Sequence, residues 1–408
     1  MAVRLKYRKH DEVTEMEPRE VYLDNSATTR VDPRVTEAML PYFSERYGNP
    51  NSLHRLGREA REAVDGARAK VAALINAEPT DIIFTGAGSE ADNLAIKGAA
   101  WALRERGKGN HIITSAIEHH AILDTVKWLG KMGFEYTVLP VDSRGMVSPE
   151  DLEKAIRPDT ILATIMAANN EIGTIQPVRA LGEVCRAHGV MFHTDGVQAA
   201  GHIKVDVKEL PVDMMTMAAH KMYGPKGLGA LYVRRGIKLI PTLHGGGQEF
   251  GLRSGTENVP GIVGFGKAAE IAKERLDAGE DRKLAALRDY LIEGVLSRIP
   301  ESQLTGAAGD DRLPFHASFT VKYIEGEGML LLLDAAGIYA SSGSACTSGS
   351  LEPSYVLLAT GLDHATAHGS VRMTMSHETT KEDVDYVLEQ FPRIVEKLRA
   401  MSPFYNKK

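Results

Sequence analysis

The sequence predicts an α/β fold with a large, mainly parallel-sheet domain and a smaller α+β domain. Through the middle of the chain, short apolar segments alternate with helical patterns, an order typical of parallel sheets with helices on both faces. The last third mixes strand and helix patterns instead. A length of 408 residues is ample for two domains. We therefore place the large domain at residues 30–276 and the small one at residues 1–29 and 277–408.

The large domain is expected to begin with alternating strands and helices. Strands are expected at residues 81–86, 111–115, 136–139, 160–166, 190–193 and 214–217. Helical patterns occupy residues 89–106, 120–132, 149–156 and 178–188. Ser89 is the expected N-cap of the first helix, because Asp92 follows it at the spacing of a capping box.

The rest of the chain begins with a glycine-punctuated strand, GLGALYV, at residues 227–233. Residues 259–299 are mainly helical, and we expect the domain boundary inside this stretch, near residue 276. Further strands are expected at residues 317–321 and 370–375, and further helices at residues 327–336 and 381–400. These mixed elements predict the second domain.

The composition excludes several classes of protein. The chain has 48 basic and 54 acidic residues, and this net charge of −6 gives no basic field for nucleic acid. No apolar run reaches the roughly 18 residues that a membrane helix needs, and the polar N-terminus does not resemble a secretory signal. Two cysteines without a CxxC pair predict neither a disulfide framework nor a zinc site. We expect a cytoplasmic protein that binds neither nucleic acid nor membranes.

The first segment with chemical character is TGAGSEADN (Thr85–Asn93), a glycine-rich turn between a strand and a helix. Small residues such as Gly88 and Ser89 let backbone N–H groups approach a phosphate, whose charge the helix dipole favours. Read alone, the turn suits a tight connection as well. No Walker or GxGxxG pattern indicates a nucleotide.

Two further segments, HTDGVQ (His193–Gln198) and AAHKMYGPKG (Ala218–Gly227), each follow an apolar strand. Asp195 is expected at the carboxyl end of its strand, where open α/β sheets bind ligands. A buried aspartate needs a cationic partner, such as the ring nitrogen of pyridoxal phosphate. Lys221 is expected to be desolvated, which makes its amine available for a Schiff base. Read alone, Asp195 also suits a helix cap, and Lys221 also suits a pair with a carboxylate.

A long polar loop, HGGGQEFGLRSGTEN (His244–Asn258), is rich in glycine and too elaborate for a turn. Loops of this kind are commonly functional. Its candidate phosphate ligands are Arg253, Ser254 and Thr256.

The two cysteines lie in contrasting surroundings. Cys346 is in SSGSACTSGS, a small and polar segment, whereas a structural cysteine normally has apolar neighbours. An exposed loop suits a thiol that acts as a nucleophile. Cys185, in the helical pattern LGEVCRAHG, is expected only to pack.

Taken together, the order of these motifs resembles the cysteine desulfurase family. Its members are fold-type-I pyridoxal-phosphate enzymes of the class V aminotransferase group. The resemblance runs from YLDNSATT (Tyr22–Thr29) to LRAMSPF, near Phe404, and so covers nearly the whole chain. Between these ends lie the glycine-rich turn, EHHAILDT, NNEIG, HTDGVQ, AHKMYGPKG and GGGQE–GLRSGT.

The resemblance implies a role for each matching residue. Lys221 is implied to carry the cofactor covalently, and Asp195 to pair with its ring nitrogen. Thr256 is implied to reach the cofactor phosphate from a partner subunit, which predicts a homodimer. The other implied contacts are Gln198 and Asn170 at the ring oxygen, His119 stacked on the ring as an acid or base, and Gly88, Ser89 and His220 at the phosphate.

For the reaction, the resemblance implies that Cys346 attacks the sulfur of L-cysteine as a thiolate and becomes a persulfide, while alanine leaves. Arg372, in SVRMTMS, matches the residue that clamps the substrate carboxylate, a task that suits a guanidinium group. Asn170 is also implied to contact the substrate.

The long form of the Cys346 loop resembles the housekeeping branch of the family, which feeds iron–sulfur cluster assembly. We therefore expect sulfur transfer from Cys346 to a scaffold or sulfur-carrier protein. Cys346 is also a candidate transient ligand of an iron–sulfur cluster.

The chain departs from the family pattern at two informative positions. Ala218 stands where the family usually has a hydroxyl residue, so one phosphate hydrogen bond, typically worth roughly 1.5–3 kcal/mol with a charged group, should be absent. Phe250 stands where the family usually has arginine. We expect weaker cofactor retention from the first change and altered loop contacts from the second.

Three alternative functions share parts of this pattern. A selenocysteine lyase would have the same cofactor residues. A pyridoxal-phosphate transaminase would not need Cys346 and would accept a keto acid. A non-catalytic scaffold paralog would be favoured by the loss of Lys221 or Cys346, and both are present.

Overall fold

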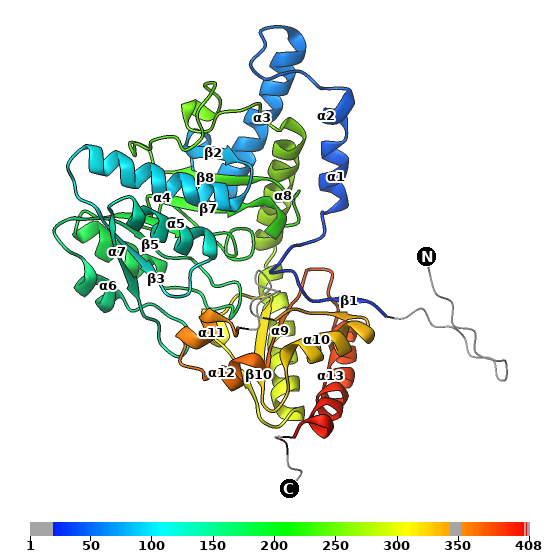
Figure 1. The fold of residues 1–408 in the computed structure, drawn as a ribbon. Coiled ribbons are helices and arrows are strands. Elements are labelled where there is room, and N and C mark those ends of the chain that lie inside the picture. The colour runs from blue at the N-terminus through cyan, green and yellow to red at the C-terminus, as the bar shows by residue number, and fades with distance from the viewer. Residues whose placement is uncertain (1–18, 343–351, 404, 406–408) are drawn as a thin grey trace.

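The computed structural model describes residues 19–342, 352–403 and 405. Its centre is a seven-stranded sheet in the order β2-β8-β7-β6-β5-β3-β4 (Figure 1). Each strand pair is parallel except those that involve β8, which runs antiparallel to both neighbours. The predicted, mainly parallel sheet is therefore confirmed. The strands are β2 (Ile82–Thr85), β3 (His111–Ser115), β4 (Glu135–Leu139), β5 (Thr160–Thr164), β6 (Met191–Asp195), β7 (Met214–Ala218) and β8 (Gly229–Val233).

Helices cover both faces of this sheet, which is why strands β5, β7 and β8 are buried along their whole length. Alternate side chains of a strand enter different cores: Ile83 packs with helices α4 and α5, and Phe84 packs with the helices of the other face. Cys185 is fully buried in that second core, as expected. The helices are α1 (Pro33–Met39), α2 (Pro41–Ser44), α3 (Arg55–Leu74), α4 (Gly88–Glu105), α5 (His120–Lys131), α6 (Pro149–Ala155), α7 (Val178–Ala187) and α8 (Val259–Asp277).

The predicted Ser89 cap of helix α4 is wrong. The helix begins at Gly88, its N-cap is Ala87, and no side chain caps it. The Asp92 carboxyl group does not return to the helix start, because it is buried on the sheet side, 3.8 Å from His193 Nε2. The first-turn N–H groups of α4 therefore receive no side-chain acceptor.

The last third of the chain builds a separate apolar core around a three-stranded antiparallel sheet, β12-β10-β9. Helix α8 gives way to α9 at Gly279, which has a φ of +70°. Strand β1 (Val21–Tyr22) returns to this region and pairs with β11 (Ile338–Tyr339). The other elements are α9 (Glu280–Arg298), β9 (Ser302–Leu304), β10 (His316–Val321), α10 (Gly326–Ala335), α11 (Tyr355–Ala359), α12 (His364–His368), β12 (Ser370–Thr374) and α13 (Lys381–Met401).

A buried ion pair fastens the long glycine-rich loop to the edge of the central sheet. Arg68 of α3 donates two hydrogen bonds of 2.7 Å to the Glu249 carboxylate, which also accepts from Phe84 N. Phe250, which replaces the usual arginine, lies with its ring 5.1 Å from the Arg68 guanidinium. In the described part of the chain, no helix is long and apolar enough to cross a membrane.

We expect Glu249→Gln to lower the free energy of unfolding by about 3–5 kcal/mol, because Arg68 would keep a buried charge without its partner. Glu59→Gln, which breaks the exposed Arg55–Glu59 pair, should cost less than about 1 kcal/mol. Urea denaturation of the two variants beside the original chain measures both values. Equal losses in both variants would contradict this role of the pair.

Candidate active site

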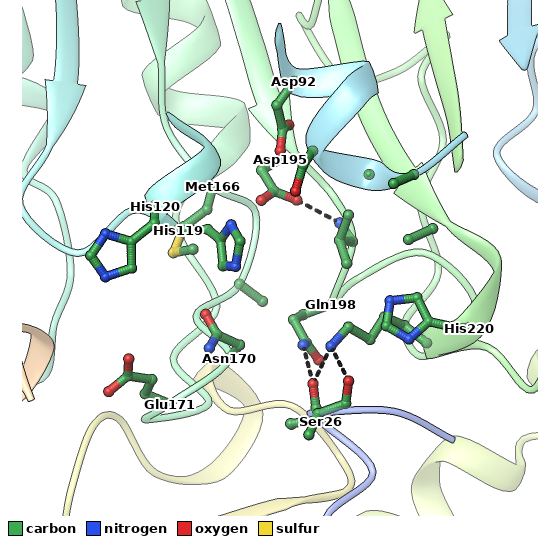
Figure 2. Close-up of a pocket in the computed structure, with 18 of the residues that line it drawn as sticks. Ser26, Asp92, His119, His120, Met166, Asn170, Glu171, Asp195, Gln198 and His220 are labelled. Carbon is green, nitrogen blue, oxygen red and sulfur yellow. Dashed lines mark hydrogen bonds between the residues drawn. The ribbon is translucent and has the colours of Figure 1, made fainter. Parts of the chain in front are cut away.

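A cavity of about 340 Å³ lies where the carboxyl ends of β6 and β7 meet the starts of helices α4 and α5 (Figure 2). The smaller part of the chain contributes Arg372 and Tyr355 to its wall. The predicted site residues on this wall are Gly88, Ser89, His119, Asn170, Asp195, Gln198, His220, Lys221 and Arg372. The fold therefore gathers residues that are up to 284 positions apart, counted from Gly88 to Arg372.

The start of helix α4 forms one end of this cavity, suited to an anion. Gly88 and Ser89 are its first two residues, and no side chain caps them. A side chain at position 88 would crowd the space, since a Cβ there would lie 3.2 Å from Val197 and 3.4 Å from Ala218. His220 lies near this end and hydrogen-bonds Thr28 through Nδ1 (3.1 Å). Burial lowers the pKa of His220 to about 4, so the ring is neutral near pH 7.

Asp195 closes the deep side of the cavity. It is the last residue of β6, it is 7% exposed, and the Val197 N–H donates to its Oδ1 (2.9 Å). Burial raises the pKa of this carboxyl group, while the Val197 hydrogen bond and the charges of His119 and Lys221 act in the opposite direction. A cationic ring nitrogen against this carboxylate would offset the cost of its burial.

Lys221 follows β7 in the short turn Ala219–Lys221, so its side chain starts at the edge of the sheet. Its Nζ donates to the backbone carbonyl groups of Ser26 and of Ala27, the latter at 2.7 Å. His202 Nε2 donates to the Lys221 carbonyl oxygen at 2.7 Å and so fixes the backbone of the turn. The amine is thereby held on the cavity wall by the N-terminal segment, while His202 holds the backbone of the turn.

His119 is the N-cap of helix α5, and this position determines which ring nitrogen carries the proton. The Ala121 N–H donates to His119 Nδ1 (3.1 Å), so in the neutral ring the proton is on Nε2. Burial lowers the pKa of His119, Asp195 opposes that shift, and Lys221 adds to it. His119 therefore offers a neutral Nε2–H donor to the cavity near pH 7.

Arg372 of β12 lines the cavity and is 2% exposed. Its Nη2 donates to Asp24 (2.9 Å) and its Nη1 donates to the Asn170 carbonyl oxygen (3.1 Å). Its buried Nε has no hydrogen-bond partner in the described part of the chain. A ligand carboxylate would supply the missing acceptor.

Three predicted residues of the glycine-rich loop, Arg253, Ser254 and Thr256, do not line this cavity. Thr256 is exposed and lies outside the cavity wall of its own chain. Cys346 lies outside the described residues. The sequence analysis did not predict several other residues that line the cavity. One of them, Glu171, lies in the NNEIG motif. The missed polar and aromatic residues are Ser26, Asp92, His120, Glu171 and Tyr355.

Comparison with known proteins explains the arrangement. The model of the family described as aminotransferase class-V matches residues 21–387. The chain belongs to this family. It is 54% identical, over 391 residues and 96% of each chain, to a protein of Methanosarcina thermophila named cysteine desulfurase IscS. The motif-based resemblance is therefore confirmed.

Two solved structures are also similar to this member of the family. A NifS-like protein has a TM-score of 0.86 and 41% identity, covering 93% of this chain and 100% of its own. A structure described as SspA in complex with cysteine has a TM-score of 0.76 and 36% identity, covering 88% of this chain and all of its own.

The cofactor of the family is pyridoxal phosphate, and the cavity residues fit it. Asp195 supplies a buried acceptor that needs a cation, the start of α4 supplies N–H donors for a phosphate, and Lys221 supplies a primary amine. Two buried atoms between these groups, Ser26 Oγ and Gln198 Oε1, have no partner among the described residues. Polar atoms that are left unsatisfied in a buried wall are typical of a ligand site.

Ala218 lies beside Gly88 at the anion end of the cavity, where a hydroxyl group would face the phosphate. We expect Ala218→Ser to slow cofactor dissociation about tenfold or more, because it adds a hydrogen bond to a charged group. Ala278→Ser, on the exposed end of helix α8, is the control. Gel filtration followed by absorbance of the retained cofactor measures the rate. Equal retention in the two variants would count against a missing phosphate contact.

Proposed function

We propose that the protein is a pyridoxal-phosphate-dependent cysteine desulfurase that transfers the sulfur of L-cysteine to Cys346. The observation that carries the proposal is that both chain ends flanking residues 343–351 lie at the cavity. Before this segment, Ser341 exchanges two backbone hydrogen bonds with Arg372. After it, Tyr355 lines the cavity and donates to the Glu118 carbonyl oxygen (2.5 Å).

The chain from Ser341 to Cys346 is short enough to keep the thiol near the cavity. Cys346 is five residues after Ser341, so its backbone stays within about 17 Å of that anchor. Chain length therefore permits a thiol at position 346 to reach a substrate whose carboxylate is held by Arg372, to whose backbone Ser341 is bonded. Class V transaminase chemistry requires no thiol at this place, so this short connection favours desulfuration.

The residues of the cavity divide the work of the reaction. Arg372 binds the substrate carboxylate, and Asp195 holds the cofactor ring by its nitrogen. Pyridoxal phosphate, when bound, withdraws electrons from the substrate α-carbon and so weakens the neighbouring bonds. Lys221 holds the cofactor between turnovers, and its amine then moves a proton at the α-carbon. His119 would stack on the cofactor ring, and its Nε2–H makes it the candidate acid or base of the site.

The sulfur step belongs to Cys346. Its thiolate attacks the sulfur of the substrate, the Cβ–S bond breaks, and an S–S bond forms. The electron pair of the broken bond stays on Cβ, which takes up a proton, so the organic product is L-alanine. The atoms of cysteine and enzyme thiol are thus conserved in alanine and enzyme persulfide.

The remaining assignments complete the cofactor site. We assign Gly88, Ser89 and His220 to the phosphate, and Asn170 with Gln198 to the ring oxygen. Thr256 is assigned to the phosphate of a partner subunit in a homodimer, which its exposed position supports. The large domain of residues 30–276 and the small domain of residues 1–29 and 277–408 are supported by their separate apolar cores.

The persulfide sulfur is proposed to pass to a scaffold or sulfur-carrier protein for iron–sulfur cluster assembly, with Cys346 as a transient cluster ligand. The IscS name of the relative supports this direction. A reducing compartment, the cytoplasm, fits a reaction that needs a free thiolate. Transfer of labelled sulfur from the loaded enzyme to a purified scaffold protein tests this step, and retention of all label on the enzyme would contradict it.

Cys346→Ala should abolish formation of sulfide and alanine from L-cysteine in the presence of a reductant, because the attacking thiolate is lost. It should leave the visible absorbance of the bound cofactor in place, since Lys221 is intact. Cys185→Ala is the matched control and should keep the activity, because that thiol is buried and burial raises its pKa to about 12. Full activity without Cys346 would overturn the proposed nucleophile.

The dimer predicts complementation between two inactive chains. Lys221→Ala lacks the cofactor lysine, and Thr256→Glu places a negative charge at the phosphate of the partner's site. In a mixed dimer, one site carries both defects and the other carries neither, so activity should return to about half of that of the original dimer. Two purified homodimers that stay inactive after subunit exchange would place Thr256 in its own chain's site.

A further inference from the structure

The carboxyl group of Glu171 lies in the cavity wall, at the opposite end from His220 (Figure 2). Glu171 is 6% exposed, and its own N–H donates to Asn169 Oδ1 at 2.8 Å. The Ser354 hydroxyl donates to Glu171 Oε2 at 2.5 Å. The backbone of Glu171 is therefore fixed by Asn169 and its carboxyl group by Ser354, and none of the steps above uses this carboxyl group.

Ser354 is itself fixed by the start of helix α11. Its Oγ accepts from the Leu357 N–H at 3.3 Å, so it is the N-cap of that helix. Tyr355 is held by Glu118 on one side and by the His120 ring, whose centroid is 5.0 Å away, on the other. The partner of Glu171 thus belongs to a rigid turn of the wall.

The charges near Glu171 are already balanced without it. Arg372 is the cation beside it, and Arg372 pairs with Asp24 at 2.9 Å. If Glu171 were ionised, two carboxylates would face one guanidinium, and a substrate carboxylate would be the third. With Glu171 uncharged, the substrate carboxylate is the second carboxylate at Arg372 and not the third, so less repulsion opposes its binding. The titratable groups that surround this end are Asp24 after β1, Arg372 on β12, His316 on β10, His119 and His120 at α5, and Tyr355 on α11.

Burial favours this uncharged form. It raises the pKa of Glu171 to about 7, while the Ser354 hydrogen bond and the charge of Arg372 act in the opposite direction. His316 does not add a positive charge, because burial lowers its pKa well below the ordinary value, with Arg312 and Arg372 acting in the same direction. Below about pH 7 Glu171 holds its proton, and above it the site gains a negative charge.

We propose that Glu171 is a positioning residue for the substrate: an amino acid carboxylate binds at Arg372 only while the Glu171 carboxyl group, held by Ser354, is uncharged. This inference rests on the proposed function, because it requires an amino acid at Arg372. If it holds, ionisation of Glu171 weakens substrate binding at alkaline pH, although Glu171 has no assigned role at the cofactor or at the reacting sulfur.

The test is binding of L-alanine, the product, to the holoenzyme, followed by the absorbance of the bound cofactor between pH 6 and 8.5. Glu171→Gln has the same size and still accepts from Ser354, but it cannot ionise. Relative to this variant, the original chain should lose affinity on the order of tenfold over that range. Parallel profiles of the two proteins would overturn the inference.

A second variant moves the profile in a defined direction. Ser354→Ala removes a donor that favours the ionised form, so the alkaline loss of affinity should begin at higher pH. Glu153→Gln, an exposed carboxylate of helix α6, should follow the original chain. A Ser354→Ala profile that is unmoved, or moved to lower pH, would contradict the role of this hydrogen bond.

Arg372→Gln separates failure of this inference from failure of the proposed function. If that variant binds L-alanine as tightly as the original chain, the carboxylate site itself is misplaced. If Arg372→Gln binds L-alanine weakly, the carboxylate site is correctly placed. If the pH profile of Glu171→Gln is then still parallel to that of the original chain, the inference about Glu171 is wrong.

Discussion

The active cavity depends on one constraint, the burial of the Asp195 carboxylate at the end of strand β6. A carboxylate without water needs a cation or several donors, and the backbone supplies one N–H, from Val197. The same burial favours the uncharged forms of two groups of this region, Glu118 and His193. It raises the pKa of Glu118 to about 8 and lowers that of His193 to about 3. The cavity thus contains a buried acidic group, Asp195, to which we assign the cofactor nitrogen as partner.

The sheet topology places Asp195 at the same edge of the sheet as Lys221 and the start of helix α4. Strands β6 and β7 are parallel neighbours, so Asp195 and the turn that carries Lys221 emerge at the same edge. Strands β2 and β7 both run antiparallel to β8, which lies between them, so they run parallel to each other. Helix α4 follows β2 and therefore starts at this edge as well. One edge of one sheet therefore presents an acid, an amine and a helix start to a single cavity.

The substrate end is built differently, from two parts of the chain. Arg372 comes from the smaller sheet, while Asn170 and Glu171 come from the loop after β5. The N-terminal segment joins the two parts, since Asn25 donates to Thr374 and Thr29 donates to His220. A shift between the parts would change the distance between Arg372 and Asp195. Recognition of the carboxylate is therefore coupled to the packing of the two cores.

Most of the fold and the cofactor site could be predicted from the sequence. The strands before Asp195 and Lys221 are short apolar runs of adequate length, and their carboxyl ends mark a ligand edge in any parallel sheet. The Ser89 cap was wrong for a physical reason, since a capping pattern is local and cannot show that Asp92 is drawn into a buried layer. Ser26 and Glu171 lie in the YLDNSATT and NNEIG motifs, and they were missed, as was Tyr355, because a local pattern does not show which side chains turn into a common wall.

By itself, the sequence determined the chemistry of this protein: an amine, a buried acid, a glycine-rich helix start and a thiol in a polar segment, in an order that resembles one family. Those features are encoded by residue type and local pattern. The tertiary structure alone decided which groups are charged. Protonation depends on desolvation and on neighbours such as Arg372 beside Glu171, which lie 201 positions apart in the chain and meet only when the two cores pack.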